Sequence, residues 1–206
     1  MIFNNFVLNN KKVFTNQGFG LIELVVSVGI MVLVTSIVMS RQDSFNGATL
    51  LRGQAYELAL NVREIQMLAI SASNRVDSAN FRNVYGLYFN KNASDSAYQI
   101  FRDNNSDYFY NNSEPFGQQG SLDKRFSIGE IRLLGSGAPV SVNELAISFE
   151  RPNFDANLYT SSGVEVADSI YAVEIDIRVR GQSGTGPGVV RTVEITRTGQ
   201  ISVKDI

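Results

Sequence analysis

One carboxylate, that of Glu23, stands inside the longest apolar run of the sequence. Between Lys12 and Arg41 no other Asp, Glu, Lys or Arg occurs. Residues 19–40 are 22 residues, and a helix of that length, rising about 1.5 Å per residue, crosses a bilayer core of about 30 Å. A charge near the centre of such a helix costs roughly 2.5–3.5 kcal/mol. Glu23 lies near one end, where the cost is smaller. Two interpretations follow: a glutamate at the level of the lipid headgroups in an ordinary signal anchor, or a carboxylate that meets a positive charge.

The residues around Glu23 have a recognisable spacing. Gly18 and Phe19 precede it, and Leu21 and Ile22 form an apolar pair directly before it. This stretch resembles the class III signal of type IV prepilins and type II secretion pseudopilins. In that family a glycine precedes the cleavage site, a phenylalanine becomes the new N-terminus, and a glutamate is the fifth mature residue.

The resemblance implies a set of modifications and partners. Prepilin peptidase would cut after Gly18, Phe19 would be N-methylated, and Glu23 would pair with the α-amine of Phe19 on a neighbouring subunit. A buried cation and a buried carboxylate each cost several kcal/mol alone and far less together. The implied partners are therefore the peptidase, other pilin or pseudopilin subunits contacted through the N-terminal helix, and the inner-membrane assembly platform.

An acidic loop is the second place where residue types and spacing point to chemistry. The segment from Asp103 to Asp107, followed by Glu114, has the alternating oxygen donors of a calcium loop. It lacks the glycine of the sharp turn, since Tyr108 occupies that position, and the sequence predicts no flanking pair of helices. Asn/Asp-rich loops are common for turn geometry alone. The favoured interpretation is a solvated loop without metal, and calcium stays open.

Basic residues near the C-terminus suggest nucleic acid as a second possible partner. Four arginines fall in the last predicted strands: Arg178, Arg180, Arg191 and Arg197. Acidic residues interleave with them, which favours cross-strand ion pairs on a solvated face over phosphate binding. The glycine-rich stretch 181–188 has no lysine and no following helix, so a hairpin loop is favoured there over a phosphate cradle.

Composition excludes several function classes. The sequence has no cysteine and no histidine, which removes disulfides, thiolate metal sites and the commonest general base. No residue set stands out as catalytic, so we predict no enzyme and no cofactor. The net charge is −2, and loss of Lys11 and Lys12 with the leader makes the mature side chains sum to −4, which argues against wide contact with a phosphate backbone.

The elements that position these residues can be read in order along the chain. We expect a cleaved leader at 1–18, a transmembrane helix at 19–40, an amphipathic continuation at 41–75 and a β domain at 76–206. Lys11 and Lys12 ahead of the apolar run predict that the residues after Ser40 lie outside the cytoplasm. The continuation shows apolar residues at alternating intervals of four and three, typical of a helix that packs one face; they are Leu51, Ala55, Leu58, Val62, Ile65, Ala69 and Ala72. A coiled-coil stalk is the weaker alternative.

The period changes after Ser73, where the expected helix from about Phe19 ends. Strands are predicted at 84–89, 98–101, 127–134, 145–150, 173–179, 189–196 and 201–203. The clearest alternation sets Val173, Ile175 and Ile177 against charged neighbours, which predicts one buried and one solvated face. We therefore expect an α+β fold in which the long helix packs on one antiparallel sheet with one covered face.

The later helix and the C-terminal strands also bear a resemblance. Residues 54–59 with Arg63, Phe149 followed by Arg151, and the ending 193–201 are similar to H-type minor pseudopilins and FimT-like minor pilins. That resemblance implies a pilin-like fold and a structural minor subunit, in either a pilus or a secretion pseudopilus, at tip or shaft. Two other functions stay open: a DNA-binding or adhesive minor pilin for DNA uptake, and a membrane-anchored sensor or enzyme domain that never polymerises.

Overall fold

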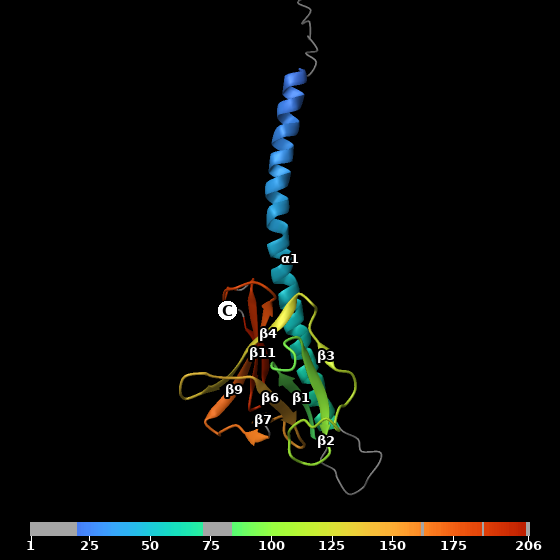
Figure 1. Ribbon diagram of the computed structural model, residues 1–206, viewed down its shortest axis with the longest axis vertical. Helices are drawn as coiled ribbons and strands as arrows, with labels where there is room; N and C mark the ends of the chain where they lie inside the picture. The colour runs from blue at the N-terminus through green and yellow to red at the C-terminus, as the bar shows by residue number, and fades with distance from the viewer. Residues whose placement is uncertain (1–19, 72–83, 162, 187, 205–206) are drawn as a thin grey trace, which may run out of the picture. The chain divides into compact units, whose positions relative to one another are not determined.

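The chain folds as one long helix followed by antiparallel strands. The computed structural model describes residues 20–71, 84–161, 163–186 and 188–204, without the side chains of 40–46. The helix is α1 (Leu21–Ser71), and eleven strands follow it in these described residues (Figure 1). They are β1 (Val84–Asn90), β2 (Ala97–Asp103), β3 (Gly120–Ser121), β4 (Phe126–Gly135), β5 (Val140–Val142), β6 (Glu144–Phe149), β7 (Ala156–Thr160), β8 (Val164–Glu165), β9 (Ile170–Val179), β10 (Val190–Thr196) and β11 (Ile201–Lys204).

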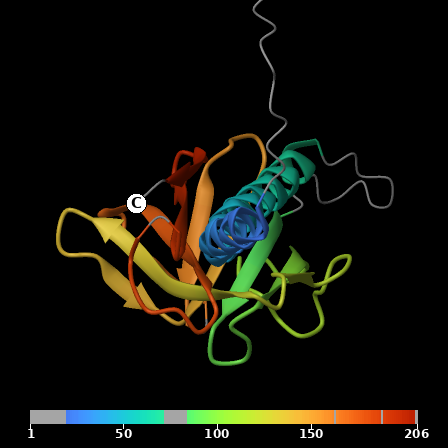
Figure 2. The same ribbon diagram turned by 90° about the horizontal axis from the view of Figure 1, so that it is seen from above.

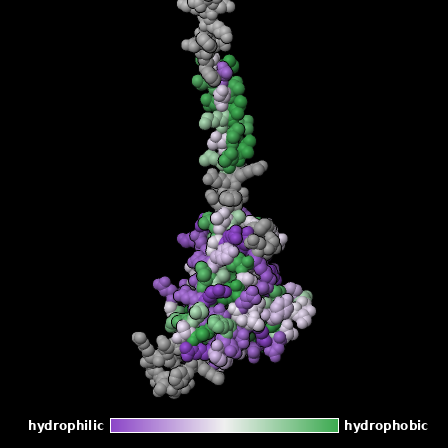
Figure 3. Space-filling model, turned by 180° about the vertical axis from the view of Figure 1, so that it is seen from behind, coloured by the Kyte–Doolittle hydropathy of each residue, from purple (hydrophilic) through white to green (hydrophobic). Residues whose placement is uncertain are grey.

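Contacts divide the chain into two units, Met1–Gln42 and Asp43–Ile206. In the first unit α1 begins at the carbonyl of Gly20, which accepts the amide hydrogens of Glu23 and Leu24 at 3.0 and 3.1 Å. Apolar side chains form most of its surface (Figure 3). Its few hydroxyls donate to carbonyls four residues earlier, as Ser27 does to Glu23 at 2.7 Å. These hydroxyls are thereby satisfied inside the helix, as a lipid environment requires.

In the second unit the amphipathic stripe of α1 is buried. Six of the seven residues that the spacing predicts are at most 4% exposed: Leu51, Ala55, Leu58, Val62, Ile65 and Ala69. The seventh, Ala72, lies outside the described residues, as does the predicted helix end at Ser73. The stripe belongs to one hydrophobic cluster, which also contains buried residues of β1, β6, β9 and β10. An α+β fold, with a helix packed on antiparallel strands, is thus confirmed.

The strands form two sheets, so the prediction of one sheet is wrong. One sheet has the order β3-β2-β1-β6-β7-β8 and the other β11-β10-β9-β4-β5, and every pairing is antiparallel. The inner faces of both contact the second part of α1 (Figure 2). The physical reason is non-local pairing: β4 pairs with β9 rather than with β3, the strand before it in the chain, and this separates β4 from the sheet that β1, β2 and β3 belong to.

The seven predicted strands are all present, with each end within three residues of its predicted position, and four short strands were not predicted. The unpredicted strands are β3, β5, β7 and β8, of five residues or fewer. Strands this short carry too little alternation to stand out from turns.

Candidate functional site

Of the three residues that the signal sequence points to, the structure describes Glu23. Gly18 and Phe19 lie outside the described residues. Glu23 is in the first turn of α1, where a carboxylate interacts favourably with the positive end of the helix dipole. Its side chain is exposed on the surface of the first unit. The geometry therefore leaves the carboxylate available to a cation from another molecule.

The helix that carries Glu23 has the length of a membrane span. Leu21–Met39 comprises 19 residues, none of them buried inside the protein. Within the part of the chain that the structure describes, this is the one helical segment both long and apolar enough to cross a bilayer. The segment is consistent with a single-pass membrane anchor, and a signal sequence near an N-terminus passes the same test of length and composition.

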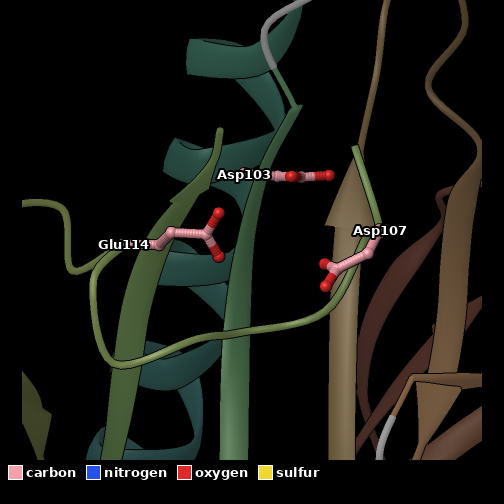
Figure 4. Close-up of side chains that lie close together, drawn as sticks. All are labelled: Asp103, Asp107 and Glu114. Carbon is pink, nitrogen blue, oxygen red and sulfur yellow. The ribbon is translucent and has the colours of Figure 1, made fainter. Parts of the chain in front are cut away.

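The three acidic residues of the predicted loop come together in space. Carboxylate oxygens of Asp103, Asp107 and Glu114 lie within 4.8 Å of one another (Figure 4). Asp103 and Glu114 are buried, whereas Asp107 is exposed. The sequence spacing thus identified a real cluster, although its members come from the end of β2 and from the loop that follows.

Backbone amides already occupy this cluster. Asp103 accepts from the amides of Ser106 and Tyr108 at 2.6 and 2.8 Å, and Glu114 accepts from Asn104 at 2.9 Å. Ser106 and Tyr108 have φ angles of 67° and 59°, in a region that residues other than glycine seldom adopt. The carboxylates therefore hold the loop in an uncommon conformation, and these hydrogen bonds account for its shape.

The four arginines do not form one phosphate-binding face. Arg191 lies opposite Ile177 in the β9–β10 register, on the core side, whereas Arg178 lies opposite Val190 on the other side. Arg180 pairs with Asp95 at 3.0 Å, and Arg197 pairs with Asp168 at 2.7 Å. The interleaved acidic residues are likewise paired, as the sequence predicts.

A charged network covers the outer face of the five-stranded sheet. Arg132 contacts Asp176 at 2.7 Å and Glu174 at 3.0 Å, and Lys204 bridges Glu174 and Glu194. The side chain of Asp176 is 2% exposed, so the predicted solvated face is buried at this residue. Arg132 from β4 and Thr192 from β10 contact Asp176, which is why its burial does not show in the alternation of β9.

This network shifts the pKa values of its members. Burial by itself would raise the pKa of Glu174, but hydrogen bonds from Lys204 and Arg132 outweigh it and the pKa is lowered. The hydrogen bond to Glu194 chiefly raises the pKa of Lys204. Glu174 and Lys204 are therefore both charged at neutral pH.

We expect stability to fall in acid because of Glu174. A carboxyl whose pKa is lowered by folding stabilises the native state above its ordinary pKa of 4.5 and loses that contribution as pH falls through the lowered value. Thermal unfolding followed by circular dichroism between pH 6 and 3 should show a declining Tm. In Glu174→Gln the decline should be shallower, whereas the exposed Glu64→Gln should follow the wild-type curve; equal slopes for all three proteins would contradict this assignment.

Sequence reasoning missed an uncharged hollow in the six-stranded sheet. It has a volume of about 280 Å³ and is lined by side chains that include Tyr88, Asn90, Gln99, Tyr110, Asn112 and Gln119. The residues come from two strands and a long loop, and no motif joins them in sequence. The one feature that these side chains share in the sequence is their type, aromatic or amide.

Comparison of the chain with models of protein families, with curated proteins and with solved structures found no match. The functional argument therefore depends on the residues themselves.

Proposed function

We propose that the chain is a structural minor subunit of a type IV pilus or of a type II secretion pseudopilus. Prepilin peptidase removes residues 1–18, Phe19 is methylated, and the apolar half of α1 holds the protein in the cytoplasmic membrane. The β domain lies on the extracytoplasmic side. Assembly transfers the apolar helix from lipid into a bundle of like helices.

The position of Glu23 carries this proposal. It is the one charged residue of an apolar helical segment, it lies in the first turn, and it is exposed. A lone carboxylate in lipid is disfavoured, whereas one that meets the N-terminal amine of an adjacent subunit keeps its charge at lower cost. The pair would also fix the axial register of two helices.

The packing of α1 supports retention of the apolar segment in the mature protein. The helix continues from Leu21 without interruption to Ser71, and its second part supplies the core of the β domain. A cut after the apolar run, as in an ordinary secretory signal, would fall within α1. A pilin-like arrangement uses one helix both as anchor and as core element.

DNA binding is the less favoured alternative. The arginines that would contact phosphates lie on both faces of a sheet, and three of them, Arg178, Arg180 and Arg197, pair with acidic residues. Soluble duplex DNA should therefore bind poorly even at low salt, where phosphate contacts are strongest.

Replacement of Glu23 tests the proposal. Glu23→Val and Glu23→Gln remove the charge and leave the helix apolar, so both variants should enter the membrane and be cut. They should be incorporated into filaments much less efficiently than wild type, by about tenfold if loss of the ion pair costs ~1.4 kcal/mol. Quantitative immunoblots of filament and membrane fractions from the native host give the ratio.

The matched control is Glu64→Gln, which removes an exposed carboxylate from the second part of the same helix. It should be incorporated like wild type. Incorporation of Glu23→Val at the wild-type level would show that Glu23 has no role in assembly within the filament. A subunit at the tip is the exception, because it has a neighbour on one side alone.

A further inference from the structure

The uncharged hollow lies between the turn at 91–96 and the loop at 104–119. Three tyrosines and four side-chain amides line it, and among the described residues that line it none is charged. The chain as a whole is 18% charged. A lining of this kind selects a ligand that is polar but carries no net charge.

Strand register places the inner wall. Tyr88 of β1 lies directly opposite Gln99 of β2, so both side chains are on the same face of the sheet. Asn90 follows two residues after Tyr88 and shares that face, because side chains alternate along a strand. One aromatic ring and two amides therefore come from rigid elements.

A second ring comes from the loop. Tyr110 packs beside Tyr88 with ring centroids 5.1 Å apart and planes inclined by 31°, and Phe109 contacts the Tyr88 ring edge to face. Tyrosines offer large, rigid and amphipathic contact area at low entropic cost. The two tyrosines form an aromatic wall.

The polar groups of the hollow are partly used and partly available. Asn90 Nδ2 donates to the Tyr88 hydroxyl at 2.9 Å, which leaves that O–H to donate elsewhere. Gln99 uses one amide N–H on the carbonyl of Ile100, and its carboxamide oxygen is an additional acceptor. Asn112 and Gln119 are exposed at the rim. Burial raises the pKa of Tyr88, so its hydroxyl is neutral at physiological pH.

The acidic cluster keeps the loop wall in place. Asn111, between Tyr110 and Asn112, donates its amide N–H to Glu114 at 3.2 Å and its side-chain N–H to Asp107 at 2.9 Å. The residues on either side of it are thereby positioned before any ligand arrives. Such preorganisation lowers the entropic cost of binding.

We propose that this hollow binds a neutral carbohydrate, one pyranose unit of an uncharged glycan. The C–H faces of a pyranose pack on aromatic rings, whose faces carry partial negative charge. Planar amides present a donor and an acceptor side by side, which matches pairs of neighbouring sugar hydroxyls. Phosphates and acidic sugars require the cationic side chains that this lining lacks. This binding activity goes beyond the proposed assembly role and does not depend on it.

Binding should be measured with the full chain in phosphatidylcholine nanodiscs, free of glycolipids and glycosidic detergents. The probes are maltotriose, cellotriose and chitotriose, with 3′-sialyllactose and a heparin disaccharide as charged comparisons. Saturation-transfer NMR and calorimetry should give saturable binding of at least one neutral trisaccharide with a Kd of about 1 mM or tighter. Tyr110→Ala should weaken it about tenfold, as expected for loss of a stacking ring.

Three further variants make the result decisive. Tyr110→Phe keeps the ring and should retain most of the affinity, whereas Asn112→Ala combined with Gln119→Ala should lose affinity without disturbing the fold, because both side chains are exposed. Tyr171→Ala removes an aromatic ring that is 57% exposed on β9 and should bind like wild type. Absence of saturable binding to every neutral probe, tighter binding of a charged probe, or equal loss in Tyr171→Ala would overturn the proposal.

Discussion

Mass spectrometry of the membrane-extracted protein, after co-expression with a matching prepilin peptidase, is expected to find a chain of 188 residues that begins at N-methyl-Phe19. The reason is the Gly18–Phe19 junction four residues before Glu23. Glycine has no Cβ, so a peptidase that reads glycine before the cut can approach the backbone closely there, and a larger side chain would obstruct it. Gly18→Ala should therefore be processed slowly or in part, and Gly18→Leu should stay uncut.

Gly20→Ala is the matched control for the cleavage experiment. A Cβ at residue 20 would meet Ile22 Cγ2 at 3.9 Å, an ordinary van der Waals contact, so the start of α1 should tolerate it. This variant should be processed at nearly the wild-type rate. An intact Met1 terminus in the wild-type protein, or a cut beyond Ser40, would contradict the prepilin assignment.

Arg132→Ala is expected to destabilise the β domain by about 3 kcal/mol. Arg132 pairs with Glu174 and Asp176, and the Asp176 side chain is 2% exposed. Removal of the guanidinium leaves a buried carboxylate with the Thr192 hydroxyl as hydrogen-bond donor and Arg178, 3.8 Å away, as a remaining cation, and burial of a weakly paired charge is costly. Urea denaturation followed by tyrosine fluorescence gives the change, since the sequence has eight tyrosines and no tryptophan.

Two comparisons separate the buried carboxylate from a general loss of charge. Arg125→Ala breaks an exposed pair with Asp123 and should change stability little, since water screens such pairs. Addition of Asp176→Asn to Arg132→Ala should recover part of the lost stability, because the buried charge that lost its close partner is then gone. A loss in Arg132→Ala no larger than that in Arg125→Ala would contradict the role assigned to Asp176.

The sequence was sufficient for features that depend on local spacing. The intervals of four and three from Leu51 to Ala69 predicted the buried stripe of α1, and the alternation from Val173 to Ile177 predicted the inner face of β9; both sets of residues are buried. Glu23 stood out because it interrupts an apolar run. Each of these signals lies within one helix or strand.

Features that depend on distant partners could not be predicted in this way. The burial of Asp176 follows from Arg132, which lies 44 residues earlier on β4. The second sheet follows from the pairing of β4 with β9. The hollow combines Tyr88 and Tyr110 from a strand and a loop. Hydrophobic period identifies an element and its buried face, but it carries no information on which element lies next to it.

The order of strands in the two sheets has a consequence for solubility. The outermost strands are β3 and β8 in one sheet and β5 and β11 in the other, and they comprise two, two, three and four residues. The ten-residue strands β4 and β9 are interior, and each pairs with a strand on either side. A short border offers another chain few free amide and carbonyl groups, which limits edge-to-edge aggregation. Copies of this domain crowded along a membrane would therefore resist joining through their sheets, and their association would be left to other surfaces.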